Sequence, residues 1–196
     1  MTYFLLGLMG YLIGNIPCSY VVGRLYGNID VRKHGSGNAG ATNVLRTVGK
    51  KAAFLALFGD ILKGLIPALM GRHFGIEGAM IASICAVMGH CYPVFMGFKG
   101  GKGVATAGGM IIGTNPLIAL GLFIYMVLVI FVTKFVSLAS VTAAIIYPIV
   151  CFLIYDNLFV SLASSLLGLL LIYKHRSNIG RLIKGVESKT SLFDKK

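Results

Sequence analysis

Seven apolar runs alternate with short polar connections along the chain, and they cover residues 3–23, 52–70, 76–96, 104–114, 116–133, 135–155 and 158–173. Most approach the roughly 20 residues that an α-helix needs to cross a bilayer. The fourth run is short for a full crossing, and Gly113, Asn115 and Pro116 break the chain after it. We expect this run to form a broken or tilted helix that lines a cavity. The pattern predicts an all-α, polytopic integral membrane protein with about seven transmembrane helices.

The composition supports a membrane location. Hydrophobic residues make up 57% of the 196 residues and charged residues only 12%, with a mean hydropathy of +0.85, far from the usual soluble range. The first run lacks the basic region of a cleavable signal, so we expect it to remain as a span. Four cysteines lie in or beside apolar runs without a CxxC pair, which favours a packing role. With no internal repeat or linker, we expect residues 1–196 to form a single domain.

The basic residues predict an orientation. The net charge is +12, but the lysines and arginines lie in short connections between apolar runs, so we expect no nucleic-acid partner. When the connections are assigned alternately to the two sides of the membrane, 16 of the 18 lysines and arginines fall on one side. Arg72 alone falls on the other side, and Lys63 lies inside an apolar run. Because cytoplasmic connections carry the excess of lysine and arginine, the N-terminus is expected outside and the C-terminus in the cytoplasm.

A glycine-rich stretch, GSGNAGATNVLR at residues 35–46, follows the first run on the expected cytoplasmic side. Its glycines permit positive backbone dihedrals, so successive amides can point into one concavity that holds phosphate oxygens. It also carries hydrogen-bonding groups and a planar cation: Ser36, Asn38, Thr42, Asn43 and Arg46. A flexible turn that ends in a positive-inside arginine is the alternative. The GxGxxG spacing follows a span rather than a strand, which excludes a dinucleotide site.

A second stretch, GHCYPVFMGFKGGKGVAT at residues 89–106, joins the third and fourth runs. If a helix begins at Val104, its free amides and the preceding Lys102 form an anion site. Met96 stands where a P-loop needs its first glycine, so this is not a Walker sequence. Lys99 also suits a lysine that extends to the membrane surface.

Three titratable residues lie within or near the end of the apolar runs. His90 is close to the end of the third run and is either a structural residue or a ligand or base. Asp60 and Lys63 are three residues apart and share one helical face, where they either neutralise each other or serve a polar cavity. We expect the sequence KGLIP, residues 63–67, to break the helix there.

Taken together and in this order, GNIPCSYVVGR, GSGNAGATNVLR, KGLIP, GHCYPVFMGFKGGKGVAT and the basic tail at residues 175–187 resemble the bacterial acyl-phosphate-dependent glycerol-3-phosphate acyltransferase family. The resemblance implies transfer of a fatty acyl group from acyl phosphate to the 1-hydroxyl of sn-glycerol 3-phosphate. The products are lysophosphatidic acid and phosphate, at the start of phospholipid synthesis. It also implies a location in the bacterial cytoplasmic membrane, with the active site on the cytoplasmic side and membrane lipids as neighbours.

The same resemblance assigns residues to the site. It implies substrate binding by Ser36, Gly37, Asn38, Gly40, Thr42, Asn43, Arg46, Lys63, Gly100, Gly101, Lys102 and Gly103. As catalytic residues we predict His90, Ser36, Arg46 and Lys102. No covalent nucleophile stands out and no HxxxxD follows any histidine, so we expect direct attack, with either His90 or the acceptor's own phosphate as base. The few acidic residues form no oxygen cage, so we expect neither metal nor cofactor.

Other functions remain open at this stage. A phosphate or organic-anion transporter also uses broken helices and cations near a cavity, but it would not explain why the polar motifs crowd one side without an inverted repeat. A phosphatidyl-group transferase would need clustered aspartates, and a structural subunit would not explain three glycine-rich and cationic blocks. The sequence does not decide the acyl chain length or the oligomeric state, for which a monomer is the simplest expectation.

Overall fold

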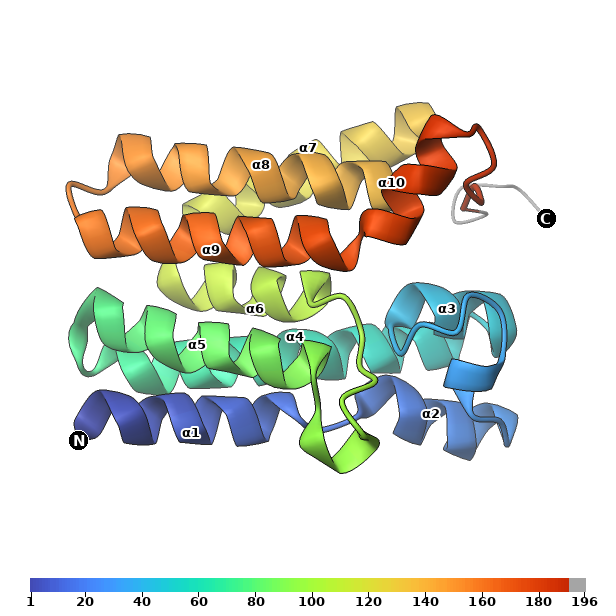
Figure 1. Cartoon of the computed structure of the whole chain (residues 1–196), viewed down its shortest axis with the longest axis horizontal. Helices are drawn as coiled ribbons and strands as arrows, with labels where there is room; N and C mark the ends of the chain where they lie inside the picture. The colour runs from blue at the N-terminus through green and yellow to red at the C-terminus, as the bar shows by residue number, and fades with distance from the viewer. Residues whose placement is uncertain (191–196) are drawn as a thin grey trace. The chain divides into compact units, whose positions relative to one another are not determined.

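The computed structural model describes residues 1–190, which hold ten α-helices, two short 3-10 helices and no strand (Figure 1). The chain groups into two compact units that divide after Asn115. The helical fold class predicted from the apolar runs is confirmed for the described residues. The prediction of a single domain stays a prediction, because grouping by contacts does not show whether either unit folds alone.

The first unit contains six α-helices and both 3-10 helices. They are α1 (Thr2–Gly14), α2 (Cys18–Gly27), η1 (Val31–Lys33), α3 (Ala41–Thr47), α4 (Lys50–Arg72), α5 (Gly75–Cys91), η2 (Val94–Met96) and α6 (Val104–Thr114). Helix α4 contacts every other α-helix of this unit, and α5 packs against α1 and α6. The unit is therefore organised around α4 and α5.

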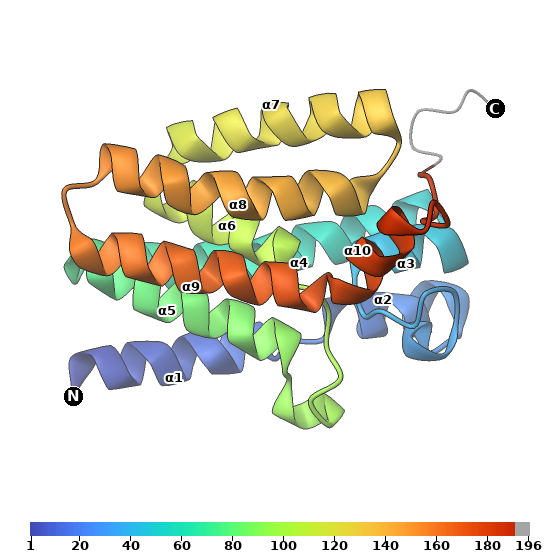
Figure 2. The same cartoon turned by 45° about the horizontal axis from the view of Figure 1, so that its top comes forward.

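The second unit contains α7 (Pro116–Thr133), α8 (Val136–Ile154), α9 (Leu158–Lys174) and α10 (Arg176–Ile183). Helix α8 packs against both α7 and α9 (Figure 2). The segment after α10 is fastened by Glu187, which accepts hydrogen bonds from Ser137 Oγ at 2.7 Å, Asn178 Nδ2 at 2.6 Å and Arg181 Nε at 2.6 Å. Burial raises the pKa of the Glu187 carboxyl, but these three donors outweigh it and lower the pKa below its usual range.

Five segments of the described residues are long and apolar enough to cross a membrane: 2–27, 50–72, 75–96, 116–133 and 136–154. Helices α9 and α10, which meet at 59°, make a sixth if they count as one bent span. Helix α6 is apolar but has only 11 residues. The bounds predicted for α6 and α7 are confirmed, whereas the count of seven crossings and the orientation stay predictions. Lys195 and Lys196, which were counted for that orientation, lie outside the described residues.

One prediction about a helix break is corrected by the structure, and the first run contains a break that the sequence did not predict. The first run is a single candidate span, residues 2–27, but α1 ends at Gly14 and α2 begins at Cys18, with Pro17 between them. Pro67 does not break α4, which continues from Lys50 to Arg72. The proline ring removes only one backbone donor. Opening α4 further would expose additional backbone groups to lipid, so a continuous helix is favoured.

Glycines allow the helices of the first unit to approach closely. A Cβ added at Gly10 or Gly14 of α1 would overlap the backbone of α5, and one at Gly64 or Gly109 would overlap at the α4–α6 contact. Lipid tails are as apolar as leucine, so helices in a bilayer gain stability from such close packing rather than from leaving water. The glycines therefore fix how α1 and α6 lie against α5 and α4.

Two adjacent glycines of α6 give a matched test of this packing. At Gly109 an added Cβ would overlap Ile61 O of α4, while at Gly108 it meets nothing within 4 Å. We expect Gly109→Ala to lower the free energy of unfolding by about 1–3 kcal/mol because the helices must separate. Gly108→Ala should leave it unchanged or raise it by up to about 1 kcal/mol. Thermal unfolding in detergent, followed by circular dichroism, measures both, and equal effects would contradict the packing argument.

Candidate functional site

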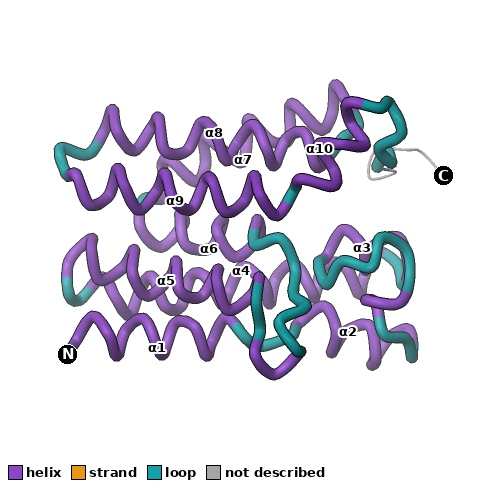
Figure 3. The backbone as a smooth tube through the Cα atoms, viewed as in Figure 1, coloured by secondary structure: helices purple, strands orange, loops and turns teal. Residues whose placement is uncertain are grey.

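A pocket lies in the first unit where α1 and α2 separate. Its walls come from the α1–α2 junction, the middle of α4, the end of α5 and the loop after α5. Figure 3 shows this loop, residues 92–103, as two teal segments on either side of the short purple helix η2 (Val94–Met96), where it passes the junction. The pocket therefore joins segments that are far apart in the sequence.

A buried ion cluster forms the floor of the pocket. Asp60 Oδ1 lies 2.9 Å from Lys63 Nζ and 3.5 Å from His90 Nδ1, and no more than 5% of any of the three side chains is exposed. The prediction that Asp60 and Lys63 share one face is confirmed by this contact. A buried charge is tolerated only when it is paired, so Asp60 fixes the positions of both partners.

Lys63 and Asn15 supply hydrogen bonds at the break between α1 and α2. Lys63 Nζ donates to Ile16 O at 2.9 Å. Asn15 Nδ2 donates to Tyr11 O at 2.6 Å, and Asn15 Oδ1 accepts from Val94 N at 2.6 Å. Since an unpaired backbone carbonyl is costly in a membrane, these side chains make the break possible. They also bring the loop after α5 against the end of α1.

Gly101 brings the two glycine-rich stretches together beside the imidazole of His90. The Nδ1 of His90 faces Asp60, whereas a Cβ added at Gly101 would overlap Nε2 and lie 2.7 Å from Ala39 O. Gly101 N also donates to His90 O at 3.1 Å. Gly101 therefore lies between the His90 ring and the backbone of the first stretch, at a point where only glycine leaves room. The roles predicted for His90, Gly100 and Gly101 in substrate binding stay predictions.

Asn43 organises the first glycine-rich stretch from within. This buried amide accepts from Ser36 N at 2.9 Å and donates to Val31 O at 2.8 Å and His34 O at 3.0 Å. Positive dihedrals occur where glycine makes them easy, at Gly35 with φ 59° and Gly37 with φ 70°. Three hydrogen bonds to the loop's own backbone account for Asn43, so its structural role is the one that the geometry shows.

The other residues predicted in the first stretch lie at or near its surface. Ser36, Gly37 and Arg46 are exposed, and Asn38, Gly40 and Thr42 are half-buried. Gly40 has extended backbone, with φ −145°, where it caps α3. The stretch therefore presents its polar side chains outward, as an anion-binding loop would.

The second stretch leads into α6 as the sequence indicates. The helix begins at Val104, and Gly103 just before it has φ 84°, a conformation that favours glycine. Lys99, Gly100 and Gly101 line the pocket, while Lys102 is half-buried and, like Arg46 and Ser36, is not among its lining residues. The catalytic and substrate-binding roles predicted for Ser36, Arg46 and Lys102 therefore stay predictions.

Sequence reasoning missed several polar residues around this pocket. Asp30 and Arg32 form an ion pair beside Tyr20, and within residues 1–190 the buried hydroxyl of Ser19 has no hydrogen-bond partner. Ser19 also lines the pocket. The available signal was an aspartate two residues before an arginine, ahead of a glycine-rich stretch, which is too common a pattern to single out. Over the described range, no group of three or more His, Cys, Asp or Glu is placed to hold a metal.

Comparisons with known proteins place this geometry in context. Residues 4–185 match the sequence model of the family Glycerol-3-phosphate acyltransferase. The glycerol-3-phosphate acyltransferase of Alkaliphilus metalliredigens (strain QYMF) is 45% identical over 190 residues, 96% of each chain. Glycerol-3-phosphate acyltransferase 2 of Bacillus cereus is 41% identical and covers 100% of this chain and 98% of its own.

Two solved structures have the same fold. The crystal structure of PlsY (YgiH), an integral membrane glycerol 3-phosphate acyltransferase, in its glycerol 3-phosphate form gives a TM-score of 0.92 at 40% identity, covering 97% of this chain and 96% of that one. Its lysophosphatidic acid form gives a TM-score of 0.89 at 40% identity, with coverages of 96% and 95%.

The buried cluster can be tested by removing one charge or both. Lys63→Met leaves Asp60 without its ammonium partner and should lower the free energy of unfolding by about 3–5 kcal/mol. Replacing both residues, Asp60→Leu with Lys63→Met, should cost less than Lys63→Met alone because no uncompensated charge remains. Thermal unfolding in detergent provides the comparison.

Lys51 near the start of the same helix is exposed and serves as the control. Lys51→Met should change the free energy of unfolding by no more than about 0.5 kcal/mol. If Lys63→Met were as stable as this control, the cluster would not be holding the helices together.

Proposed function

This chain belongs to the glycerol-3-phosphate acyltransferase family, and on that premise we propose that it transfers a fatty acyl group from acyl phosphate to the 1-hydroxyl of sn-glycerol 3-phosphate. The products are lysophosphatidic acid and inorganic phosphate. The observation that carries the proposal is the meeting of two glycine-rich stretches at Gly101, beside His90 and a pocket at the break between α1 and α2. Solved relatives in glycerol 3-phosphate and lysophosphatidic acid forms support this substrate and this product.

The groups around the pocket support acyl phosphate as the proposed donor. Phosphate leaves as a stable anion, so the reaction needs no strong general acid. The titratable groups deepest in the pocket, Asp60, Lys63 and His90, are already paired with one another. The acceptor's hydroxyl oxygen attacks the acyl carbonyl carbon, the bond from that carbon to the phosphate oxygen breaks, and the hydroxyl proton passes to a base. The enzyme's main task is then to orient two anions and offset their repulsion.

The backbone and the cations around the two stretches suit that task. Amides of the first turn of α6 would bind phosphate oxygens at a positive helix end. Arg46 and Lys102 would offset phosphate and oxyanion charge, with Ser36 as a neutral donor. No metal or cofactor enters this scheme. The acyl tail would lie between helices in the cytoplasmic membrane, with the head groups at its cytoplasmic face.

We assign the proton to the acceptor's own phosphate rather than to His90. The imidazole is only 6% exposed, its Nδ1 faces Asp60, and its Nε2 packs against Gly101. A general base must reach the proton that it removes within hydrogen-bond distance. In this position His90 serves better to hold the two stretches than to reach a substrate hydroxyl.

The donor is tested with purified protein and glycerol 3-phosphate. Acyl phosphate, acyl-CoA and acyl carrier protein are offered separately, and lysophosphatidic acid is quantified. We expect product from acyl phosphate alone. Product from acyl-CoA or acyl carrier protein at a comparable rate would refute the donor assignment, and phosphate uptake into proteoliposomes without acyl transfer would favour a transporter.

The assignment of the base is tested by the pH dependence of kcat/KM. His90→Gln should lower kcat/KM, because the loops lose their common support, but should leave the shape of the pH profile unchanged. If His90 were the base, the variant would lose the inflection that titration of this imidazole gives to the wild-type profile. The exposed His34 provides the control, since His34→Gln should alter neither the rate nor the profile.

A further inference from the structure

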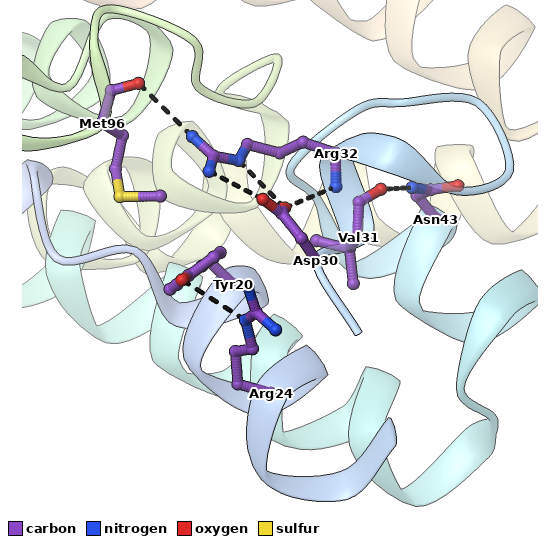
Figure 4. A network of polar contacts seen from close by, with 7 residues as sticks. All are labelled: Tyr20, Arg24, Asp30, Val31, Arg32, Asn43 and Met96. Atoms are coloured by element: carbon purple, nitrogen blue, oxygen red, sulfur yellow. Dashed lines mark hydrogen bonds and ion pairs between the residues drawn. The ribbon is translucent and has the colours of Figure 1, made fainter. Parts of the chain in front are cut away.

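A polar network at the rim of the pocket joins the segment before the first glycine-rich stretch to the second stretch (Figure 4). Arg32 lies just before the first stretch in η1, and Met96 lies in η2 within the second. Tyr20 of α2 lies beside both arginines of the network, and Tyr20 and Met96 line the pocket. The network is therefore in contact with the site, and its ion pair, Asp30 and Arg32, lies outside every motif noted in the sequence.

Asp30 holds Arg32 on one side. Asp30 Oδ1 accepts from the backbone N and from Nε of Arg32, both at 3.0 Å, and Oδ2 lies 2.8 Å from Nη2. The aspartate is only 7% exposed. Its hydrogen bond from the Arg32 side chain lowers the pKa of the Asp30 carboxyl to about 2. The pair therefore stays fully ionised above the ordinary carboxyl range, and its contribution is lost only as the pH falls toward 2.

The remaining terminal nitrogen of the guanidinium, Nη1, contacts the second stretch. Arg32 Nη1 donates to Met96 O at 3.4 Å, and Arg32 Cζ lies 5.1 Å from the centre of the Tyr20 ring. Because Asp30 occupies Nε and Nη2, the guanidinium is held in one orientation, with Nη1 directed at Met96. A planar guanidinium that is fixed in this way holds the two segments at a more constant distance than the flexible ammonium group of a lysine would.

We propose that Arg32 is a positioning residue that fixes the spacing between the two glycine-rich stretches. The inference rests on the proposed function, because the spacing matters only if both stretches bind phosphate groups that must meet in one geometry. A displacement of about 1 Å at a reacting centre can lower a rate about 100-fold. With two donors committed to Asp30 and a third directed at a backbone carbonyl, Arg32 acts through the loops rather than on a substrate.

A double-mutant cycle distinguishes positioning from direct substrate contact. Arg32→Lys and Asp30→Asn should each lower kcat about 10-fold to 100-fold. The KM for acyl phosphate and the KM for glycerol 3-phosphate should change less. The double variant should be no worse than the poorer single variant, because the pair acts as one unit. If Arg32 bound substrate phosphate instead, Asp30→Asn would leave KM unchanged or lower it, and Arg32→Lys would raise KM. That pattern, or additive effects, would overturn the proposal.

Arg24 is a matched control for Arg32. Its guanidinium lies 5.5 Å from the same Tyr20 ring and its Nε donates to the Tyr20 hydroxyl at 3.3 Å, but its hydrogen bond does not reach the second stretch. Arg24→Lys should therefore keep the wild-type kcat. If Arg32→Lys behaved like Arg24→Lys, the positioning role would be wrong.

A second measurement does not depend on turnover. Amide hydrogen exchange should become faster in residues 35–40 and 97–103 together in Arg32→Lys, and in neither segment in Arg24→Lys. Exchange that is faster in the first segment alone would mean that Arg32 stabilises only its own loop. Wild-type protein that fails to use acyl phosphate would refute the proposed function, whereas an active wild type with unchanged Arg32 variants would refute only the positioning role.

Discussion

The break in the first membrane helix is the constraint on which the site depends. Lipid offers no hydrogen bonds, so a chain that stops being helical at Asn15 must find partners for its backbone within the protein. Lys63 donates to Ile16 O, and Asn15 bonds to Tyr11 O and Val94 N. A lysine in that place needs a counter-charge, which Asp60 supplies, and Asp60 in turn orients His90. The pocket, the buried cluster and the position of the second loop are thus consequences of a single interruption in a helix.

Close helix packing converts this local arrangement into a rigid support. Glycines bring α1 against α5 and α6 against α4 until their backbones touch, so the helix ends that carry the loops have little freedom. The loops themselves are held by side chains that do not extend toward a ligand. Asn43 holds the first from within, and His90 packs against Gly101 of the second, which lies against Ala39 O of the first. Flexible glycine amides can therefore form a defined surface, because the residues beneath them are fixed.

The sequence predicted the features that depend on local patterns. Apolar runs and the Gly-Thr-Asn-Pro boundary placed α6 and α7 correctly, and a spacing of three put Asp60 and Lys63 on one face. It failed where the outcome depends on partners distant in the chain. Pro17 and Pro67 look alike as helix breakers, but only the break at Pro17 has Lys63 and Asn15 to satisfy its backbone. The bond from Arg32 to Met96 spans 64 residues, a separation across which no single-sequence pattern operates.

The same distinction explains why so few side chains in this site look catalytic. Asp60, Lys63, His90 and Asn43 have the residue types that usually mark chemistry, yet each is committed to other parts of the protein. With acyl phosphate as the proposed donor, little is left for an acid, a base or a nucleophile to do. The task that remains in this proposal is electrostatic: two phosphates must approach each other, and amides and cations fixed before they bind lower that barrier without reorganising. Buried charges serve this arrangement by holding the backbone beneath those amides and cations in place.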